Sequence, residues 1–454
     1  MRRTKMLIIG TLTVTLAVSL AYLSRWELPN SAQGVEGLNP ADMAWVCVAA
    51  ALVMLMTPAL GFFYGGLVRR KNVASTIVQC LTIFAVASAV WTLWGYSLAF
   101  APSVGGLGLV GNLKHLLLRG VDGAPDTNYA ATIPASAFYF FQLKFAAITP
   151  ALIIGAFAER IKFRSLLMFI VVWATLVYAP VAHWVWGVGG WLRNLGALDF
   201  AGGTVVHILA GTSALASAMV IGRRHVRGET QHPNNVPYTI LGAALLWFGW
   251  FGFNAGSALA INGVAVNALV TTNIAAAFAT LSWMAVDWYL TGKPSATGAA
   301  IGAVCGLVAI TPAAGFVDVS AAIVIGMVAG LVCNFTCVLL NRTSLDDTLD
   351  VFACHGMGGI WGALATGIFS QKLVNPAGAD GLLYGNPRQF LVQVLAIVVV
   401  FVYGFVASVV ILKVLDLVAG LRVSPEEEEL GLDVSQHGEY AYWPELSPSE
   451  TGSN

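Results

Sequence analysis

Two histidines stand inside long apolar runs of this 454-residue chain, and each follows an aspartate by eight positions. The pairs are Asp199 with His207 and Asp347 with His355, and segments rich in small residues follow both histidines. A neutral imidazole offers one hydrogen-bond donor and one acceptor. Two such rings therefore suit a small, polar, neutral solute, whereas a stream of metal cations requires carboxylates or rings of carbonyl oxygens.

The spacing predicts that both imidazole rings lie near the middle of a membrane. Eight residues of helix rise about 12 Å, so histidines entering a core of about 30 Å from opposite faces leave a gap of about 6 Å. A single intramembrane histidine is equally well explained by a hydrogen bond to a neighbouring helix. Two histidines at the same depth in the membrane instead favour a shared transport pathway.

Asp199 also has a purely structural interpretation. It precedes Phe-Ala-Gly-Gly at the start of an apolar run. An aspartate at a helix start accepts hydrogen bonds from free backbone N–H groups and complements the helix dipole. We expect this capping role, and a negative potential at the outer mouth is compatible with it.

The elements that position these residues are membrane-spanning helices. Hydrophobic residues make up 57% of the chain and charged residues 10%, against about 25% charged in soluble domains. The apolar runs last about twenty residues, which fits helices and not the short alternating strands of outer-membrane barrels. Zero net charge gives no indication of nucleic-acid binding. The six cysteines lie in apolar runs and are predicted to be small core residues, not disulfides or a metal cluster.

We predict eleven spans, at residues 42–66, 73–101, 136–158, 164–186, 200–222, 238–258, 264–291, 296–312, 317–340, 351–370 and 389–418. The short loops on one side carry most of the basic residues (Arg69, Arg70, Lys71, Arg160, Lys162, Arg164, Arg223, Arg224, Arg227, Lys293 and Arg342). The other side carries Lys114, Arg119, Arg193, Lys372 and Arg388. The first set is therefore expected in the cytoplasm, so that span 1 starts outside and the C-terminus lies inside.

Similar segments suggest an internal repeat. TPALGFFYGG in span 1 resembles GWFGFNAGSA in span 6, and the two aspartate–histidine pairs fall in spans 5 and 10. Because five is odd, the halves have opposite topology, as in many transporters with a site at the midplane. The fold class is an all-α polytopic membrane protein with eleven transmembrane helices in two inverted five-helix repeats plus a final long helix.

Three regions are expected along the chain. Residues 1–35 have a basic start and an apolar run, which indicates a signal peptide or a signal anchor. Residues 36–421 form the membrane domain, and 422–454 form a polar cytoplasmic tail. In the tail, Ser424, Pro425 and Glu427 predict a capping box, either on a short solvated helix or on a regulatory segment.

Several segments, in the same order along nearly the whole chain, resemble the Amt/MEP/Rh ammonium transporter family, and its bacterial Amt branch most closely. They are TPALGFFYGGLVRRKN, FFQLKFAAITPALIIGAFAERIKF, DFAGGTVVHILAGTSALASAMVIGRR, GWFGFNAGSA, DVFACHGMGGIWGALATGIF and RVSPEEEELGLDVSQHGEYAY. The resemblance implies a homotrimer in the cell (inner) membrane with one pore per subunit. It implies ammonium transport and no enzymatic reaction, cofactor or metal.

The resemblance also assigns site residues. It implies pore twin histidines at His207 and His355; an outer ammonium site of Trp186, Ser257 and Phe145; a gate of Phe145 and Phe253; neighbours Phe141 and Gln142; and a structural or proton-path aspartate at Asp199. Without it, packing explains the phenylalanines and an interfacial belt explains Trp186. The implied mechanism is recruitment of ammonium, loss of a proton near the gate, passage of ammonia and reprotonation inside, with or without a separately moved proton.

Lys144 departs from this pattern, because a charge inside span 3 would repel ammonium if it faced the vestibule. Adjacent residues of a helix point in directions about 100° apart, so the Lys144 side chain can instead reach the outer surface or a subunit contact.

The resemblance of the tail implies a PII-type signal protein as a cytoplasmic partner. The same segments also fit an ammonium sensor that signals through the tail. An intramembrane hydrolase is disfavoured, because the sequence has neither a paired carboxylate site nor an HExxH pattern.

Overall fold

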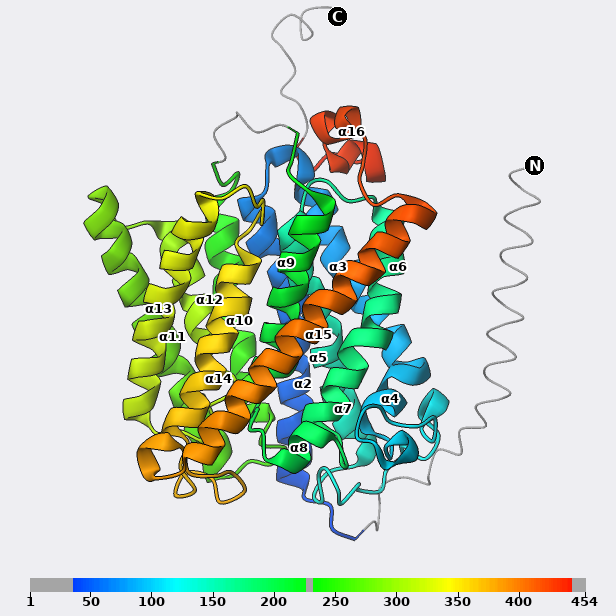
Figure 1. Ribbon diagram of the computed structural model, residues 1–454, viewed down its shortest axis with the longest axis vertical. Coiled ribbons are helices and arrows are strands. Elements are labelled where there is room, and N and C mark those ends of the chain that lie inside the picture. Colours follow the sequence, from blue (N-terminus) through cyan, green and yellow to red (C-terminus); the bar gives the residue numbers. More distant parts are fainter. Residues whose placement is uncertain (1–35, 226–231, 443–454) are drawn as a thin grey trace, which may run out of the picture.

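The computed structural model describes residues 36–225 and 232–442. Within these ranges the regular elements are helices, and the long ones run side by side as a bundle (Figure 1). Helix α16 caps one end of the bundle and α8 lies at the other, so we name the two ends after these helices. The expected signal peptide or anchor at 1–35 lies outside the described residues.

The longer helices are α2 (Pro40–Leu67), α3 (Val73–Val90), α5 (Ala135–Ile153), α6 (Phe163–Trp173), α9 (Leu209–Ile221), α10 (Val236–Gly256), α11 (Gly263–Thr291), α12 (Ala296–Ile310), α13 (Val319–Asn341), α14 (Gly358–Phe369) and α15 (Pro387–Ala419). The shorter ones are α4 (Tyr96–Phe100), α7 (Ala179–Trp186), α8 (Trp191–Leu195) and α16 (Pro425–Leu430).

Short turns extend or join these helices. The π-helical turns are η2 (Trp91–Gly95), η6 (Ala174–Tyr178), η7 (Gly203–Ile208), η8 (Phe352–Met357) and η10 (Asp433–His437). The 3₁₀ turns are η1 (Arg70–Asn72), η3 (Val104–Gly106), η4 (Leu116–Leu118), η5 (Ile154–Phe157) and η9 (Leu382–Tyr384). Because η2 and η6 join α3 to α4 and α6 to α7, each of these pairs forms one long helical segment.

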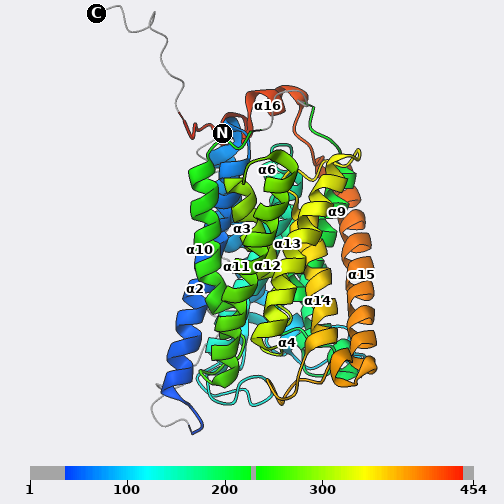
Figure 2. The ribbon, with the colours of Figure 1, turned by 90° about the vertical axis from the view of Figure 1, so that its left-hand side faces the viewer.

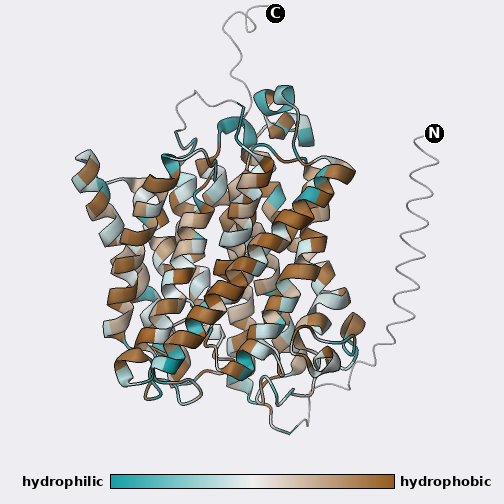
Figure 3. Cartoon of the chain, viewed as in Figure 1, coloured by the Kyte–Doolittle hydropathy of each residue, from teal (hydrophilic) through white to brown (hydrophobic). Residues whose placement is uncertain are grey.

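The chain is a multi-pass membrane protein. In the described ranges, nine helical segments are long and apolar enough to cross a membrane. The predicted spans at 296–312 and 351–370 correspond to shorter helical segments, α12 and the joined η8 and α14. Apolar residues cover the length of the helices, and polar residues gather at the two ends of the bundle (Figure 3).

Helices α2 and α10, which begin the two predicted halves, pack closely along their length (Figure 2). Glycines on α10 make this approach possible. A Cβ on Gly242 would lie 2.3 Å from the backbone nitrogen of Phe63, and one on Gly252 would lie 2.7 Å from the carbonyl oxygen of Ala49. Glycines along the length of α10 thus bring two helix backbones together, as in other membrane bundles.

The long helix α15 crosses the bundle diagonally over α9 and α6 (Figure 1). A buried polar contact fixes the crossing: the Ser213 hydroxyl accepts hydrogen bonds from Ser408 Oγ at 2.9 Å and from Trp173 Nε1 at 3.1 Å.

The cysteines differ in part from the prediction. Five are buried free thiols, whereas Cys47 lies exposed on the surface of α2. An apolar run cannot distinguish a lipid-facing side chain from a core one, because both are hydrophobic.

Candidate functional site

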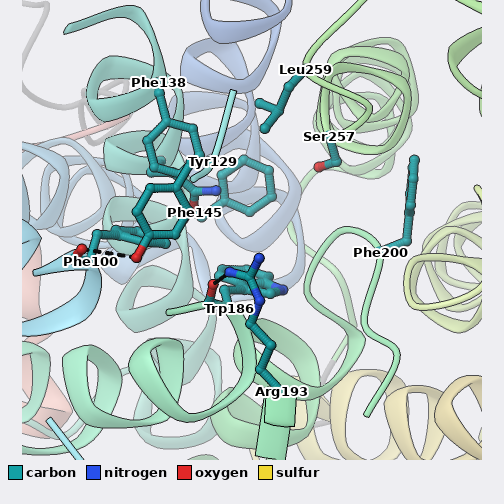
Figure 4. Close-up of a pocket in the computed structure, with 10 residues that line it drawn as sticks. Phe100, Tyr129, Phe138, Phe145, Trp186, Arg193, Phe200, Ser257 and Leu259 are labelled. Carbon is teal, nitrogen blue, oxygen red and sulfur yellow. Dashed lines mark hydrogen bonds between the residues drawn. The ribbon is translucent and has the colours of Figure 1, made fainter. Parts of the chain in front are cut away.

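A pocket of about 150 Å³ lies toward the α8 end of the bundle, and we call it the aromatic pocket (Figure 4). Its lining is mostly aromatic: Phe100, Tyr129, Phe138, Gln142, Phe145, Trp186, Arg193, Phe200, Ser257 and Leu259. The faces of aromatic rings attract cations through their quadrupoles, by about 2 kcal/mol when the cation is desolvated. The pocket is therefore suited to a small cation.

Ser257 and Trp186, two of the residues predicted for the outer ammonium site, both line the aromatic pocket. The Ser257 hydroxyl donates to the carbonyl of Phe253 at 2.8 Å, which leaves its oxygen lone pairs free to accept an N–H. Trp186 is the last residue of α7, and its indole N–H donates to the carbonyl of Asp199 at 2.9 Å. That hydrogen bond fixes the indole against the loop that leads into η7.

Two phenylalanines close the inner side of the aromatic pocket. The rings of Phe145 on α5 and Phe253 on α10 lie with centroids 4.3 Å apart and planes tilted by 35°. Phe145 is 1% exposed and Phe253 is fully buried. A solute can pass them only if the rings move.

The two histidines lie beyond the phenylalanines, in a second cavity that we call the histidine cavity. Their Nδ1 atoms are 3.2 Å apart, and their ring planes are within 18° of parallel. The remaining lining is apolar: Met56, Leu60, Ile148, Leu152, Val206, Leu246, Trp250, Phe253 and Val304. The contact expected from the sequence spacing is therefore present.

The Nδ1–Nδ1 hydrogen bond restricts the tautomers of the pair. One ring must donate from Nδ1 and the other must accept there, so one Nε2 carries a hydrogen and the other does not. His207 Nε2 is buried and has no hydrogen-bond partner in the described part of the chain. The pair thus offers one donor and one acceptor to a neutral solute.

Turns η7 and η8 bring the two rings together, because each carries one histidine at the start of a helix. Their approach depends on a glycine. A Cβ on Gly211 of α9 would lie 2.2 Å from the backbone nitrogen of Gly356, the residue after His355. Since backbone atoms cannot yield, only glycine allows this contact.

Asp199 caps η7. Its Oδ1 accepts hydrogen bonds from the backbone N–H groups of Gly202 and Gly203 at 2.9 and 2.6 Å. Its Oδ2 accepts from Thr204 and Val205 at 2.9 and 3.0 Å. Both oxygens are thereby occupied, as the capping interpretation of the sequence predicts.

The remaining predicted neighbours separate into two groups. Gln142 lines the aromatic pocket, whereas Phe141 is fully buried beside Phe145 and does not line it. Lys144 does not line it either, because its ammonium lies 3.5 Å from the ring centroid of Phe140 and 5.3 Å from that of Phe84. The concern that Lys144 opposes a cation in this pocket does not hold.

Arg193 is a lining residue that the sequence interpretation missed. Its Nη1 donates to the carbonyl of Trp186 at 2.5 Å, and its guanidinium lies 5.8 Å from the ring of Tyr129. The charge count placed Arg193 in an outer loop, but no sequence pattern indicated that the loop folds back over the pocket.

The tail packs against the α16 end of the bundle. The capping box at Ser424 is formed, and Glu428 accepts hydrogen bonds from Arg422 and from the backbone of His225. Asp433 accepts from the backbone N–H groups of Ala74 and Ser75 at 3.1 and 2.7 Å. The described part of the tail, up to residue 442, therefore packs on the start of α3.

Comparison with known proteins agrees with these features. The family model described as "Ammonium Transporter Family" matches residues 44–442. An ammonium transporter of Bacillus subtilis is 50% identical over 402 residues, covering 88% of this chain and 98% of its own. The crystal structure of Mep2 from Saccharomyces cerevisiae superposes with a TM-score of 0.83 at 37% identity, covering 90% and 94% of the two chains. A structure described as a sensor Amt protein has a TM-score of 0.79 at 30% identity and covers 87% and 98%. The chain therefore belongs to the ammonium transporter family.

Proposed function

We propose that the chain binds ammonium in the aromatic pocket, removes a proton near the phenylalanines and passes ammonia along the His207–His355 pair. One observation carries this proposal. Phe145 lines the aromatic pocket, Phe253 lines the histidine cavity, and the two rings lie 4.3 Å apart between them. The order of cation-binding pocket, closed gate and neutral polar pair matches the order of those steps.

The cost of moving a charge favours ammonia as the species in the histidine cavity. Burying an ammonium-sized ion costs several kcal/mol even after relaxation of the protein. Neutral ammonia avoids most of this cost. It can hydrogen-bond to imidazole nitrogens, and His207 Nε2 has no partner among the described residues.

The removed proton either returns outside or crosses by a separate route. We propose that Asp199 has a chiefly structural role, because each of its two carboxylate oxygens already accepts hydrogen bonds from two backbone N–H groups. Transport that carries one charge per ammonium requires a second route for the proton.

Uptake of ammonium or methylammonium into liposomes containing the purified protein, with current recorded, tests this function. We expect saturable uptake, and His207→Ala should change its rate or its selectivity. Absence of uptake with the pure wild-type protein would contradict transport. Uptake without current would contradict the charge-carrying version only.

A sensor role is the alternative, and the likeness to the sensor Amt structure favours testing it. A sensor would change the position of its tail on binding ammonium without sustaining flux. Measuring tail accessibility and flux on the same sample distinguishes the two functions.

We further propose the location and assembly of the protein. The α16 end, with most of the basic loops, faces the cytoplasm, and the membrane is the cell (inner) membrane. Residues 36–421 form the transport domain of a homotrimer, residues 1–35 a signal peptide or anchor, and residues 422–454 a tail that meets a PII-type protein. Crosslinking of the membrane-embedded protein and binding assays with purified PII-type protein test these statements.

A further inference from the structure

The α16 end holds a third pocket, of about 280 Å³, which we call the acidic pocket. It lies between the ends of the helices and the loop that joins α13 to η8, and its carboxylates belong to loops outside the predicted spans. Its lining includes the four carboxylates Glu159, Asp346, Asp347 and Asp350, with Arg69, Arg224 and His232. Among the described residues, Glu159 and Asp346 are engaged in ion pairs, and Asp347 and Asp350 are not.

The ion pairs account for two of the four carboxylates. Glu159 accepts from Arg69 at 2.7 Å and from Arg224 at 3.2 Å. Asp346 accepts from Arg224 at 2.8 Å, and Arg160 donates to its backbone carbonyl. In the described ranges, neither Asp347 nor Asp350 has a basic group within ion-pair distance.

Asp347 presents an unused acceptor to the pocket. It is 9% exposed, and its Oδ2 accepts from the backbone N–H of Phe352 at 2.7 Å. Its Oδ1 is buried and has no hydrogen-bond partner in the described part of the chain. A buried acceptor without a partner is costly, so a donor that enters the pocket stabilises it.

Asp199 and Asp347 hold equivalent positions, each eight residues before a histidine, but their carboxylate oxygens are hydrogen-bonded differently. Asp199 uses both oxygens to cap η7, through four backbone N–H groups. Among the described residues, Asp347 accepts a well-formed hydrogen bond from η8 at Oδ2 only, although the Val351 backbone N–H also interacts with its carboxylate. Among the described residues, the aspartate therefore has both oxygens hydrogen-bonded at one end of the pathway and has one oxygen without a hydrogen bond at the other.

Resting on the function proposed above, we propose that Asp347 and Asp350 form an ammonium-binding and reprotonation site at the inner end of the pathway. Ammonia leaving the histidine cavity takes a proton from one carboxylic acid: an N–H bond forms, an O–H bond breaks, and ammonium and a carboxylate result. The carboxylate holds the ammonium and then regains a proton from a hydronium ion of the cytoplasm as the ammonium leaves. No electron is transferred overall, and water is the other product.

Burial of the Asp347 and Asp350 side chains places the pKa of both carboxyl groups near neutral pH. Burial raises the pKa of Asp347 to about 6, and burial with the neighbouring Asp347 charge raises the pKa of Asp350 to about 7. The charged and titratable groups around them include Tyr64, Arg69, Glu159, Arg160, Arg224, His232, Cys337, Asp346 and Cys354. Asp347 and Asp350 can therefore be protonated in part of the population at pH 6–7.

The tests use Asp347→Asn and Asp350→Asn, singly and together. Both changes suit the backbone, because an asparagine at 347 can still accept from Phe352 and an asparagine tolerates the positive φ of 54° at 350. Asp416→Asn is the matched control. Asp416 is exposed near the end of α15 toward α16, accepts from the Leu421 backbone and does not line the pocket.

The first experiment follows the carboxylic-acid C=O band by infrared difference spectroscopy in lipid vesicles. We expect a band that titrates near pH 6–7 and whose midpoint falls when ammonium chloride replaces N-methylglucamine chloride. The double variant should lose that band and the shift, whereas Asp416→Asn should keep both. An ammonium-dependent shift that persists in the double variant would overturn the proposal, as would its absence in wild type.

The second experiment measures initial methylammonium uptake at fixed outer pH while the pH on the α16 side is varied. From pH 6 to pH 8, wild-type uptake should fall by up to about tenfold, as the protonated fraction of a group with pKa about 7 falls. The double variant should be insensitive to this change, and a wild-type pH profile in it would contradict the proposal. If wild type shows no uptake at all, the function proposed above fails, while the infrared shift still decides whether the carboxylates bind ammonium.

Discussion

At the scale of single residues, the affinity of the proposed outer site depends on the Ser257 hydroxyl and on the positive charge of Arg193. Ser257 Oγ donates to the Phe253 carbonyl and keeps its lone pairs for a substrate N–H. Arg193 supplies a positive charge to a pocket whose other lining is aromatic or neutral. These two residues should act on substrate affinity in opposite directions.

Ser257→Ala should raise the KM for ammonium by roughly ten- to a hundredfold, because a hydrogen bond to a charged group contributes about 1.5–3 kcal/mol. Initial uptake rates over a concentration series give the KM. Ser257→Thr keeps the hydroxyl and should restore most of the affinity. An unchanged KM in Ser257→Ala would exclude this oxygen as an ammonium ligand.

Arg193→Gln should lower the KM by a few fold at low salt, because it removes a like charge from the rim of the pocket. The difference should shrink as ionic strength rises and screens the charge. Arg119→Gln, in an exposed loop away from the pocket, is the control. Lys144→Met should also leave the KM unchanged, since Lys144 lies against Phe140. Equal effects of Arg193→Gln and Arg119→Gln would show that only net surface charge matters.

At the scale of elements, two π-helical turns carry the histidines, and a tail segment caps a helix. Gly211 lets α9 touch the backbone beside His355. Asp433 lies more than three hundred positions from the α3 backbone groups that it binds. Each is a contact between distant segments that no local pattern specifies.

Gly211→Ala should displace η8 and impair transport, because the added methyl group meets the backbone of Gly356. Overpacking of this kind typically costs about 1–3 kcal/mol. Uptake and thermal stability in detergent measure the two effects. Gly263→Ala, which adds the same methyl group where nothing lies within 4 Å, should change neither. Wild-type uptake in Gly211→Ala would mean that the histidine spacing tolerates such a shift.

Asp433→Ala should release the tail from the start of α3, because it removes the acceptor for two backbone N–H groups. Limited proteolysis should then cleave the tail faster than in wild type. Asp433→Asn retains an acceptor and should be intermediate. Equal cleavage rates in all three proteins would show that other contacts hold the tail.

At the scale of the whole molecule, ion pairs join loops that follow different helices at the α16 end. Arg224 links Glu159 to Asp346, and Arg69 also binds Glu159. The Arg224 side chain and the nearby Arg160 charge hold the pKa of Asp346 at about 2, against the effect of burial. The loops of both predicted halves are thereby tied together.

The stability contributed by Asp346 should depend on pH. Its folded pKa lies below the unfolded value of about 3.9, so its contribution is present above pH 4 and is lost as the pH falls toward 2. Asp346→Asn should unfold at lower temperature than wild type at pH 7, and the difference should narrow between pH 4 and pH 2. A constant difference across that range would contradict the ionic origin.

The sequence by itself determined the helical membrane fold, the cap at Asp199, the capping box at Ser424 and the meeting of His207 with His355. These follow from local composition and from spacing along helices of known rise. Only the tertiary structure decided that Arg193 lines the aromatic pocket and that Lys144 and Phe141 do not. It also decided that, among the described residues, Asp347 has an oxygen without a hydrogen bond, whereas both oxygens of Asp199 are bonded. The physical reason is that side-chain direction, loop return and the number of available backbone donors depend on contacts between segments far apart in the chain.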